Sequence, residues 1–418
     1  MTAPSPLDAA RQAEFARRVA LAPLAGRLPA LVPAASRPQP LHVCYLVPRT
    51  DVGGGARVIF DHATHLTGLG ATVTLVSHFP PPDWYPLPSR FLRVPFGREL
   101  AEGLPPCDVV VAGYWDQILA ARLRGVAPVV HFEQGDAHLF EELEPAFEQV
   151  VRAHLRAADA TVTVSRRVAE VLAGRYAVAA EVVHNAVDPA VFHPPTAGPP
   201  PGGTGYLLLV GWDGHAFKGI AEAREMYRRL HAEDPDLDLV WVTPRPPRDP
   251  FGTVVVAPDQ ARLADLYRGA QVYVCASRYE SFPLPPLEAM ACGAPVVSTR
   301  NTGVLEYAVD GHNALLADVG DVAGLASAVR RFRTDPDLVA TCRAGGLVTA
   351  AGFRWPTLLR PLRDRYDALA RRTPGPAAGG PWRFPRGEPD FVDPADAAEW
   401  PARLAGTPAG EVALPVRY

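Results

Sequence analysis

Strand-like and helix-like patterns alternate along most of this chain, and that alternation constrains its fold more than any other feature. The runs that predict strands in the first half are 42–47, 72–77, 109–112, 129–131, 161–164 and 181–184. Those in the second half are 206–210, 239–242, 253–256, 272–275, 295–298 and 314–316. Helical patterns fall at 56–69, 221–230, 260–268, 321–332, 336–350 and 355–371. Because such alternation is typical of parallel sheets with crossover helices, we expect an α/β protein.

The length of the chain predicts more than one domain. Its 418 residues exceed the size of an ordinary single domain. A Pro/Gly-rich stretch at 194–205 is typical of a linker. We therefore expect an N-terminal extension at 1–40, a first Rossmann-like domain at 41–193 and the linker at 194–205. A second Rossmann-like domain at 206–352, a final helical segment at 353–372 and a Pro/Gly-rich tail at 373–418 should follow.

Composition excludes several classes of protein. The net charge of −4 gives no basic footprint for nucleic acid. The five cysteines are scattered and odd in number, which favours buried thiols in a reducing compartment over a disulfide set. No apolar run is long enough to span a membrane, and prolines interrupt the N-terminal apolar stretch, so we expect no secretory signal. An amphipathic helix over 7–21 would pack on the fold or, alternatively, touch a membrane. We expect a cytoplasmic protein, with peripheral contact at the inner membrane face as the alternative.

Glu280 and Glu288, eight positions apart, carry the strongest functional signal. They follow the predicted strand 272–275, with one carboxylate in a loop and the other in the first turn of a helix. Pro285 and Pro286 suit the first helical position, and the amides of a helix start attract phosphate. Two carboxylates beside an anion site at the carboxyl end of a parallel strand suit a ligand with both phosphate and hydroxyls. A nucleotide sugar is such a ligand.

This stretch continues as Ala-Met-Ala-Cys-Gly-Ala-Pro-Val-Val and leads to Thr-Gly-Val-Leu-Glu at 302–306. The whole resembles the Glu-x7-Glu signature of the family-four retaining glycosyltransferases. The resemblance implies the GT-B fold, with two Rossmann-like domains facing across a cleft and a final helix that crosses back to the first. It implies that Glu280 supports the reaction beside the donor sugar, that Glu288 holds the ribose hydroxyls, and that Glu306 lies near the nucleotide. The expected ligands are a nucleotide-sugar donor and a hydroxyl acceptor of unknown identity, with no metal or other cofactor.

A glycine run, Gly53-Gly54-Gly55, follows the first predicted strand and precedes the first helix. Glycines there let a backbone approach a ligand and leave amides free for oxygens. Val58 stands where a dinucleotide-binding fingerprint needs its third glycine, so that fingerprint fails. The resemblance places Gly53 and Gly54 beside the donor diphosphate or the acceptor; a plain tight turn is the alternative.

Lys218 opens the second half in the sequence Lys-Gly. The family usually has Gly-Arg a few residues earlier, and both cations meet the diphosphate. Lys218 matches, but Trp212 stands where the arginine is expected. A developing negative charge needs a fixed positive partner. Arg278 and Arg300 are candidates for the second cation by position alone.

Phe282 and Leu284 complete the donor-binding set that the resemblance implies. They flank Pro283, in a place where many relatives have Glu-Gly-Phe-Gly and use backbone amides to meet sugar hydroxyls. Proline has no N–H to donate, so the choice of donor does not carry over from the family.

His131 ends a predicted strand in the first half, and strand ends are where α/β proteins bind ligands. The resemblance places a similar histidine near the donor sugar and the acceptor. His131 would orient the sugar or share the proton of the acceptor hydroxyl, and Glu133 and Asp136 are alternates for that proton. A histidine that only caps a loop is the other interpretation.

Several other patterns have a structural interpretation. Asp236 and Asp238 form an Asp-x-Asp pair that leads straight into a strand, so we expect a loop rather than a metal site. His62 and His65 lie three apart without an evident third ligand, and we expect them at the surface or the edge of the cleft. Ser165 is expected to cap a helix.

The sequence leaves two rivals to a glycosyltransferase in glycan or glycoconjugate biosynthesis. One is a sugar-nucleotide epimerase on the same GT-B scaffold, which would need no acceptor. The other is a catalytically inactive scaffold that binds nucleotide, which the departures at Trp212 and Pro283 keep open. Nothing in the sequence indicates an oligomeric state.

Overall fold

The computed structural model describes residues 6–35, 40–196, 205–376 and 382–384, and most of the predicted linker and tail lies outside them. Two compact units divide the chain. Unit 1 contains Met1–Val183 and Pro356–Tyr418, and unit 2 contains His184–Trp355. The segment 184–193, expected in the first domain, lies in unit 2.

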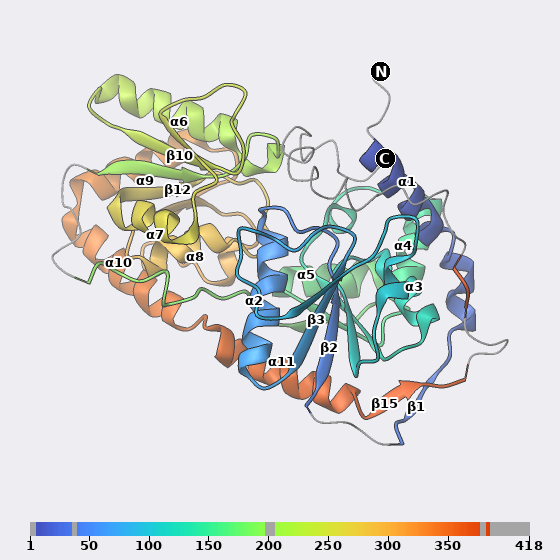
Figure 1. Ribbon diagram of the computed structural model, residues 1–418. Helices are drawn as coiled ribbons and strands as arrows, with labels where there is room; N and C mark the ends of the chain where they lie inside the picture. Colours follow the sequence, from blue (N-terminus) through green and yellow to red (C-terminus); the bar gives the residue numbers. More distant parts are fainter. Residues whose placement is uncertain (1–5, 36–39, 197–204, 377–381, 385–418) are drawn as a thin grey trace. The chain divides into compact units, whose positions relative to one another are not determined.

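Unit 1 is built on a seven-stranded parallel sheet (Figure 1). The strands are β2 (His42–Leu46), β3 (Thr72–Ser77), β4 (Arg90–Arg93), β5 (Val109–Ala112), β6 (Val129–Glu133), β7 (Ala160–Thr163) and β8 (Glu181–Val182). They lie in the order β4-β3-β2-β5-β6-β7-β8, and all their pairings are parallel. The chain thus winds outward from β2 in one direction and then from β5 in the other. This reversal creates a switch point between β2 and β5, the place where doubly wound sheets bind ligands.

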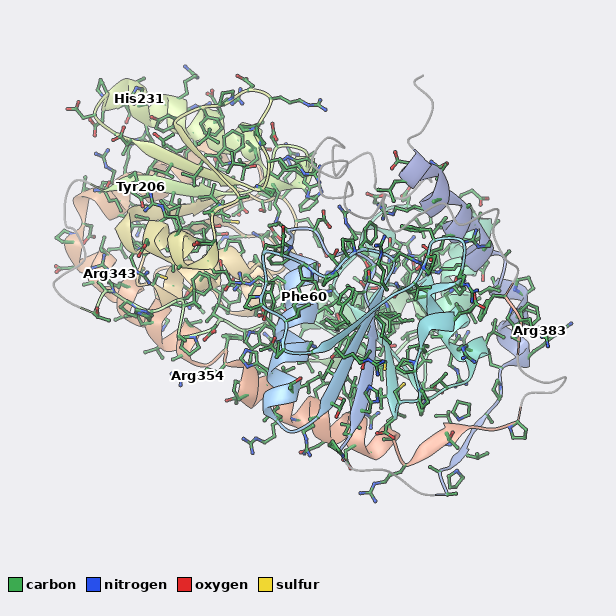
Figure 2. The ribbon with its side chains drawn as sticks, in the orientation of Figure 1. Phe60, Tyr206, His231, Arg343, Arg354 and Arg383 are labelled. Carbon is green, nitrogen blue, oxygen red and sulfur yellow. The ribbon has the colours of Figure 1, made fainter. Side chains whose placement is uncertain are left out.

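Helices cover the sheet of unit 1. They are α1 (Pro6–Val19), α2 (Gly54–Gly68), α3 (Gln117–Arg124), α4 (Pro145–Leu155), α5 (Arg166–Val171) and α11 (Trp355–Leu369). The buried face of α2 carries Phe60, labelled in Figure 2. Ser165 caps α5 by accepting a hydrogen bond from the Val168 amide at 3.2 Å, which confirms its predicted role. His62 is fully buried and stacks on Phe132, so the expected surface position is wrong for that residue.

Unit 2 repeats the same plan with six strands. They are β9 (Tyr206–Val210), β10 (Leu239–Thr243), β11 (Thr253–Val256), β12 (Ala270–Cys275), β13 (Val296–Thr299) and β14 (Leu315–Ala317). The order is β11-β10-β9-β12-β13-β14, and all pairings are parallel, so the switch point lies between β9 and β12. The strands bury leucine, valine and tryptophan on both faces, as a sheet covered by helices on both sides requires.

The helices of unit 2 lie on both faces of its sheet, with α6 on one side and α7 and α8 on the other (Figure 1). They are α6 (Ile220–Glu233), α7 (Gln260–Gly269), α8 (Leu284–Ala291), α9 (Val322–Thr334) and α10 (Pro336–Ala351). Met226 of α6 and Phe332 of α9 enter the same apolar core as Trp241 of β10. The strands and helices predicted from the sequence in both halves are therefore confirmed, each within a few residues at its ends.

Three features of unit 1 were missed in the sequence. The edge strand β4 is short and flanked by arginines, and α3 and α4 were left unassigned. The antiparallel pair of β1 (Leu31–Pro33) with β15 (Arg372–Pro374) joins two distant parts of the chain, so no local pattern predicts it.

All five cysteines are free thiols, four of them buried. In the described part of the chain, every helix is too short or too polar to cross a bilayer.

The N-terminal helix α1 packs on unit 1 through a buried charge network. Arg18 lies 2.5 Å from Glu14, 3.0 Å from Glu99 and 3.3 Å from Asp116, and all four side chains are buried. Phe15 packs edge-on against Trp115 on the same face of the helix. One guanidinium therefore holds three carboxylates that would otherwise repel one another in a medium of low dielectric constant.

We predict that Arg18→Met will destabilise the chain by about 3–5 kcal/mol, because it leaves buried carboxylates without their cation. Urea unfolding followed by circular dichroism measures the loss. The control is Arg167→Met, which breaks an ion pair with Glu170 whose side chains are 50% and 67% exposed. It should cost less than about 1 kcal/mol. Equal losses in the two variants would contradict the assignment.

Candidate active site

Lys218 and Glu280 meet at the switch point of unit 2. Lys218 ends the loop after β9, and Glu280 lies in the loop after β12, so the strand order brings them together. The Lys218 Nζ donates to Glu280 Oε1 at 2.7 Å, and the Ser277 hydroxyl donates to the same oxygen at 2.8 Å. The two charged side chains remain 24% and 13% exposed. The pair is therefore fixed in position yet open to a ligand.

Two glycines allow neighbouring backbone segments to approach the loop of Glu280 closely. Gly219 has φ +65°, and a Cβ there would overlap the carbonyl oxygen of Ala276. A Cβ on Gly303 would lie 2.6 Å from the Glu280 carbonyl oxygen. The Thr302 hydroxyl donates to that same oxygen at 3.0 Å. The motifs Lys-Gly and Thr-Gly thus contain glycines because the loops of three strands meet without room for side chains.

Lys218 is the only lysine in a chain that has 41 lysines and arginines together. Burial lowers the pKa of its ammonium group, but the attraction of Glu280 outweighs burial and raises that pKa above its ordinary value. The ammonium form is therefore favoured at neutral pH. Its compact charge differs from the planar guanidinium that the chain uses everywhere else. The presence of a single lysine was therefore a further sequence signal for a functional role of Lys218, in addition to the Lys-Gly motif.

The start of α8 differs from the expected one. The helix begins at Leu284, so Pro285 and Pro286 occupy its second and third positions rather than the first. Pro283 precedes it as the capping residue. Because proline has no N–H, only Leu284 and Leu287 among the first four helical residues have an amide to offer a phosphate. Lys218 therefore supplies more of the positive field here than the sequence suggested.

Glu288 lies deeper than Glu280, in the second turn of α8. It is 1% exposed, and the Tyr267 hydroxyl donates to its Oε2 at 3.0 Å. Burial and the neighbouring Glu288 charge both raise the pKa of Tyr267 well above its usual value. A neutral tyrosine thus holds the orientation of this carboxylate.

Glu306, Phe282 and Leu284 lie around the same loops. His184 Nε2 and Glu306 Oε2 are 3.0 Å apart. The Phe282 ring is buried among His184, Tyr307 and Phe353, with centroid distances of 5.2, 5.3 and 5.5 Å. Leu284 is buried as well. The side chains of Phe282 and Leu284 therefore belong to the packing of unit 2.

The two arginines considered as replacements for the missing cation are paired elsewhere. Arg278 forms an ion pair with Glu222 of α6. Arg300 lies 2.6 Å from Asp310 and 3.6 Å from Asp318. Arg245, which sequence reasoning missed, lies over the ring of Trp212 at 5.5 Å. A cation is thus present beside the position where the family has arginine, but it comes from the loop after β10.

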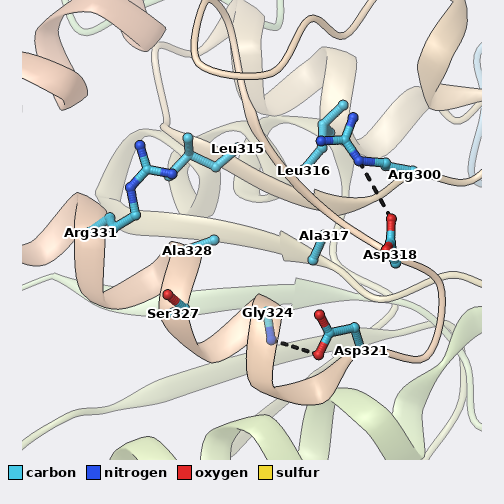
Figure 3. Close-up of a pocket in the computed structure, with 10 residues that line it drawn as sticks. All are labelled: Arg300, Leu315, Leu316, Ala317, Asp318, Asp321, Gly324, Ser327, Ala328 and Arg331. Carbon is cyan, nitrogen blue, oxygen red and sulfur yellow. Dashed lines mark hydrogen bonds and ion pairs between the residues drawn. The ribbon is translucent and has the colours of Figure 1, made fainter.

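Arg300 lines a separate pocket at the edge strand β14 (Figure 3). The pocket has a volume of about 240 Å³ and contains Arg331 of α9 and Asp318 among its walls. Apart from Arg300, none of the predicted site residues lines it. Because Lys218, Glu280, Glu288 and Glu306 do not line this pocket, we place the candidate site at the switch point instead.

In unit 1, the glycine run begins α2 at its own switch point, after β2. Gly53 is extended with φ −175°, and Gly54 is the first helical residue. A Cβ on Gly54 would meet nothing within 4 Å, and one on Gly53 only the Asp51 carbonyl at 3.9 Å. Neither the backbone conformation nor the described packing of the unit requires glycine at these two positions.

His131 and Glu133 lie at the carboxyl end of β6, fully buried. The Glu133 Oε1 accepts hydrogen bonds from the amides of Gly135 and Asp136, at 2.7 and 3.0 Å. Its Oε2 lies 3.5 Å from His131 Nε2 and 3.3 Å from His138 Nε2. Burial lowers the pKa of His131 to about 4, against the opposing pull of Glu133. His138 joins a cluster that sequence reasoning had assigned to His131, Glu133 and Asp136 alone.

Two family models match the chain, one in each half. The model described as Glycosyltransferase Family 4 matches residues 52–191, and that of Glycosyl transferases group 1 matches 205–335. The chain belongs to this family of glycosyltransferases, and its two Rossmann-like units make up the GT-B fold.

Curated relatives match only part of the chain. The D-inositol 3-phosphate glycosyltransferase of Acidothermus cellulolyticus is 39% identical over 122 residues, which are 28% of this chain and 27% of the relative. That of Corynebacterium kroppenstedtii is 31% identical over 168 residues, or 40% of this chain and 34% of the relative. The matched segments thus span about a quarter to a third of these relatives.

Solved structures share the fold over most of the chain. Sucrose-phosphate synthase from Thermosynechococcus elongatus has a TM-score of 0.66 at 20% identity and covers 79% of this chain and 99% of its own. HepE from Anabaena, solved with UDP and glucose, has a TM-score of 0.62 at 15% identity and covers 78% and 100%. At these identities the likeness establishes the fold alone.

We predict that Gly219→Ala will destabilise unit 2 more than Gly311→Ala. Both glycines have positive φ, +65° and +73°, but a Cβ on Gly311 would meet nothing within 4 Å. The control should cost about 1 kcal/mol for its left-handed backbone. Gly219→Ala adds overlap with Ala276, worth about 1–3 kcal/mol more. Thermal unfolding of both variants measures the difference, and equal melting temperatures would refute the close approach.

Proposed function

We propose that this chain transfers a sugar from a nucleotide-sugar donor to a hydroxyl acceptor with retention of anomeric configuration, in glycan or glycoconjugate biosynthesis. The observation that carries the proposal is the Lys218–Glu280 pair, at 2.7 Å, on the switch point of a family-four fold. Two further facts support it. The matching relatives bear glycosyltransferase names, and HepE was solved with UDP-glucose as well as with UDP.

Unit 2 binds the donor in this proposal. The Lys218 ammonium meets the diphosphate, whose negative charge grows as the glycosidic bond breaks, and a fixed cation stabilises that charge most in the transition state. In the free protein Glu280 neutralises Lys218. When the diphosphate takes over the ammonium, the Glu280 carboxylate becomes available to the donor sugar beside it. Arg245, on Trp212, supplies a second positive charge near the same loop.

Glu288 holds the ribose hydroxyls, with Tyr267 fixing its orientation from behind. Glu306 supports the nucleotide from the neighbouring loop, together with His184. The backbones of Phe282 and Leu284 contribute on either side of Pro283, which has no amide to give. With Lys218 and Arg245 as cations, the departure of the diphosphate requires no metal ion in this scheme.

Unit 1 receives the acceptor. Gly53 and Gly54 leave backbone amides accessible at the start of α2. His131 is fully buried, so we assign it the positioning of the loop after β6 rather than direct proton transfer. Five free thiols support a cytoplasmic location for the protein, because such thiols persist in a reducing compartment.

A thermal-shift panel of nucleoside diphosphates and nucleotide sugars tests the donor side directly. A ligand that binds the folded protein raises its melting temperature. Nucleoside diphosphate release with and without a panel of hydroxyl compounds then tests transfer. Isomerisation of the nucleotide sugar without any acceptor would instead identify an epimerase, and no response to any nucleotide would overturn the proposal.

The sole lysine provides a chemical test of the donor site. Reductive methylation should modify Lys218 and the α-amino group, and a bound nucleotide sugar should slow modification at Lys218 only. Peptide mass spectrometry distinguishes the two amines. Equal labelling of Lys218 with and without a ligand that raises the melting temperature would place the diphosphate elsewhere.

We predict different consequences for the three charged residues of the site. Glu280→Gln and Lys218→Met should mainly reduce turnover, the latter by about 10²–10³-fold, because a preorganised charge is lost. Glu288→Ala should weaken nucleotide binding by about tenfold or more, because charged hydrogen bonds are lost. Steady-state kinetics and nucleotide titration measure these effects. Glu225→Gln, on the exposed face of α6, is the control and should leave both quantities unchanged. Unaltered kinetics in the Glu280 and Glu288 variants would contradict the roles.

A further inference from the structure

A second group of side chains with metal-binding chemistry lies in unit 1. His131 lies in β6 and Glu133 ends it, Asp136 follows in the next loop, and His138 lies in the short helix η3 (Ala137–Leu139). The pattern is His-x-Glu-x-x-Asp-x-His. Gly135, with φ +93°, turns the chain back so that residues from both sides of the turn converge.

The buried polar atoms of this group make no well-formed hydrogen bond, although Glu133 Oε2 lies within ion-pair distance of both histidines. Both ring nitrogens of His131, both of His138 and the Glu133 Oε2 have no hydrogen-bond partner among the described residues. All three side chains are fully buried. An unsatisfied buried polar group costs about 1–3 kcal/mol, so a native fold seldom keeps five together. A proton shared between Glu133 and one histidine satisfies only part of the set.

The spacing of these atoms matches the coordination sphere of a small transition-metal ion. Zn²⁺ binds histidine nitrogen and carboxylate oxygen at about 2.0–2.1 Å, which in a tetrahedral site puts neighbouring ligand atoms about 3.3–3.5 Å apart. The Glu133 Oε2 lies 3.5 Å from His131 Nε2 and 3.3 Å from His138 Nε2. Ligand atoms of Glu133, Asp136 and His138 all lie within 4.8 Å of one another. One ion would bind the Glu133 Oε2 and one nitrogen of each histidine, which are three of the five atoms.

We propose that Glu133, Asp136 and His138, with His131 as a fourth ligand after a small side-chain movement, form a binding site for one Zn²⁺ or a chemically similar transition-metal ion. Imidazole together with carboxylate favours zinc-like ions over Mg²⁺ or Ca²⁺, which take oxygen ligands. The Glu133 Oε1 is already held by two backbone amides, so its second oxygen is presented in a fixed direction. This is the supported ligand geometry that metal sites commonly have.

The ion would lock the loop that supports the glycine run of α2. Gln134, between two of the ligands, donates from Nε2 to the Gly55 carbonyl oxygen at 3.1 Å. On the far side of the loop, Tyr176 and Arg175 donate to the His138 carbonyl oxygen at 2.8 and 3.1 Å. Tyr176 and Arg175 thus hold the backbone of the loop at His138, and the ion would hold the side chains of the same loop. A role as a metal ligand would explain why His131 is buried although its loop contacts the glycine run, where the acceptor is expected.

Metal analysis of the full chain tests the site. After dialysis against a chelator, titration with Zn²⁺ should reveal one equivalent bound, and the melting temperature should rise with Zn²⁺ concentration. X-ray absorption at the zinc edge should show only nitrogen and oxygen ligands at about 2.0–2.1 Å. Mg²⁺ at the same concentration should produce no shift.

His138→Gln and Asp136→Asn should each weaken Zn²⁺ binding at least tenfold and abolish the zinc-dependent thermal shift. His65→Gln, a partly exposed histidine on α2, is the control and should bind as the parent does. Circular dichroism and the nucleotide thermal shift of unit 2 establish that each variant is folded. No stoichiometric Zn²⁺, or equal binding by the two ligand variants and the parent, would overturn the proposal and leave ordered water as the partner. Neither result depends on whether the chain proves to be a sugar transferase.

Discussion

The close approach of backbones around Glu280 is the constraint on which the candidate donor site depends. Gly219 meets the Ala276 carbonyl and Gly303 meets the Glu280 carbonyl, with no space for a side chain at either contact. These contacts join the loops after β9, β12 and β13. Once they form, Lys218 and Glu280 have little freedom to separate, and a salt bridge between partly exposed groups becomes a preorganised feature. An isolated pair at such exposure would contribute little.

The same strand order in the two units places function at equivalent points. In unit 2 the winding reverses between β9 and β12, and the loops there carry Lys218 and Glu280. In unit 1 it reverses between β2 and β5, and the loop after β2 carries the glycine run. At a reversal, helices leave the sheet on opposite faces, so the strand ends between them stay uncovered. Each unit therefore offers one such place without any specialised architecture.

Positive charge is used in two different ways in this chain. Arg18 is buried among three carboxylates and ties α1 to unit 1, which needs several donors in a planar array. Lys218 instead offers a compact charge with one protein carboxylate as its partner. The chain contains a single lysine among many arginines, which accords with that difference. The arginines nearest the site by sequence, Arg278 and Arg300, are occupied by other acids.

The sequence by itself determined the alternation of strands and helices, the two-part division of the chain and the motif around Glu280, because apolar periodicity and glycine or proline positions are local signals. Only the tertiary structure decided that α8 starts at Leu284, which places two prolines without an N–H in its first turn. It also decided that Arg245 rather than Arg278 lies beside Trp212, and that His138 completes a cluster with His131 and Glu133. It also decided the pairing of β1 with β15. The reason is physical: these features depend on how loops and chain ends far apart in sequence pack together, and no local pattern records that.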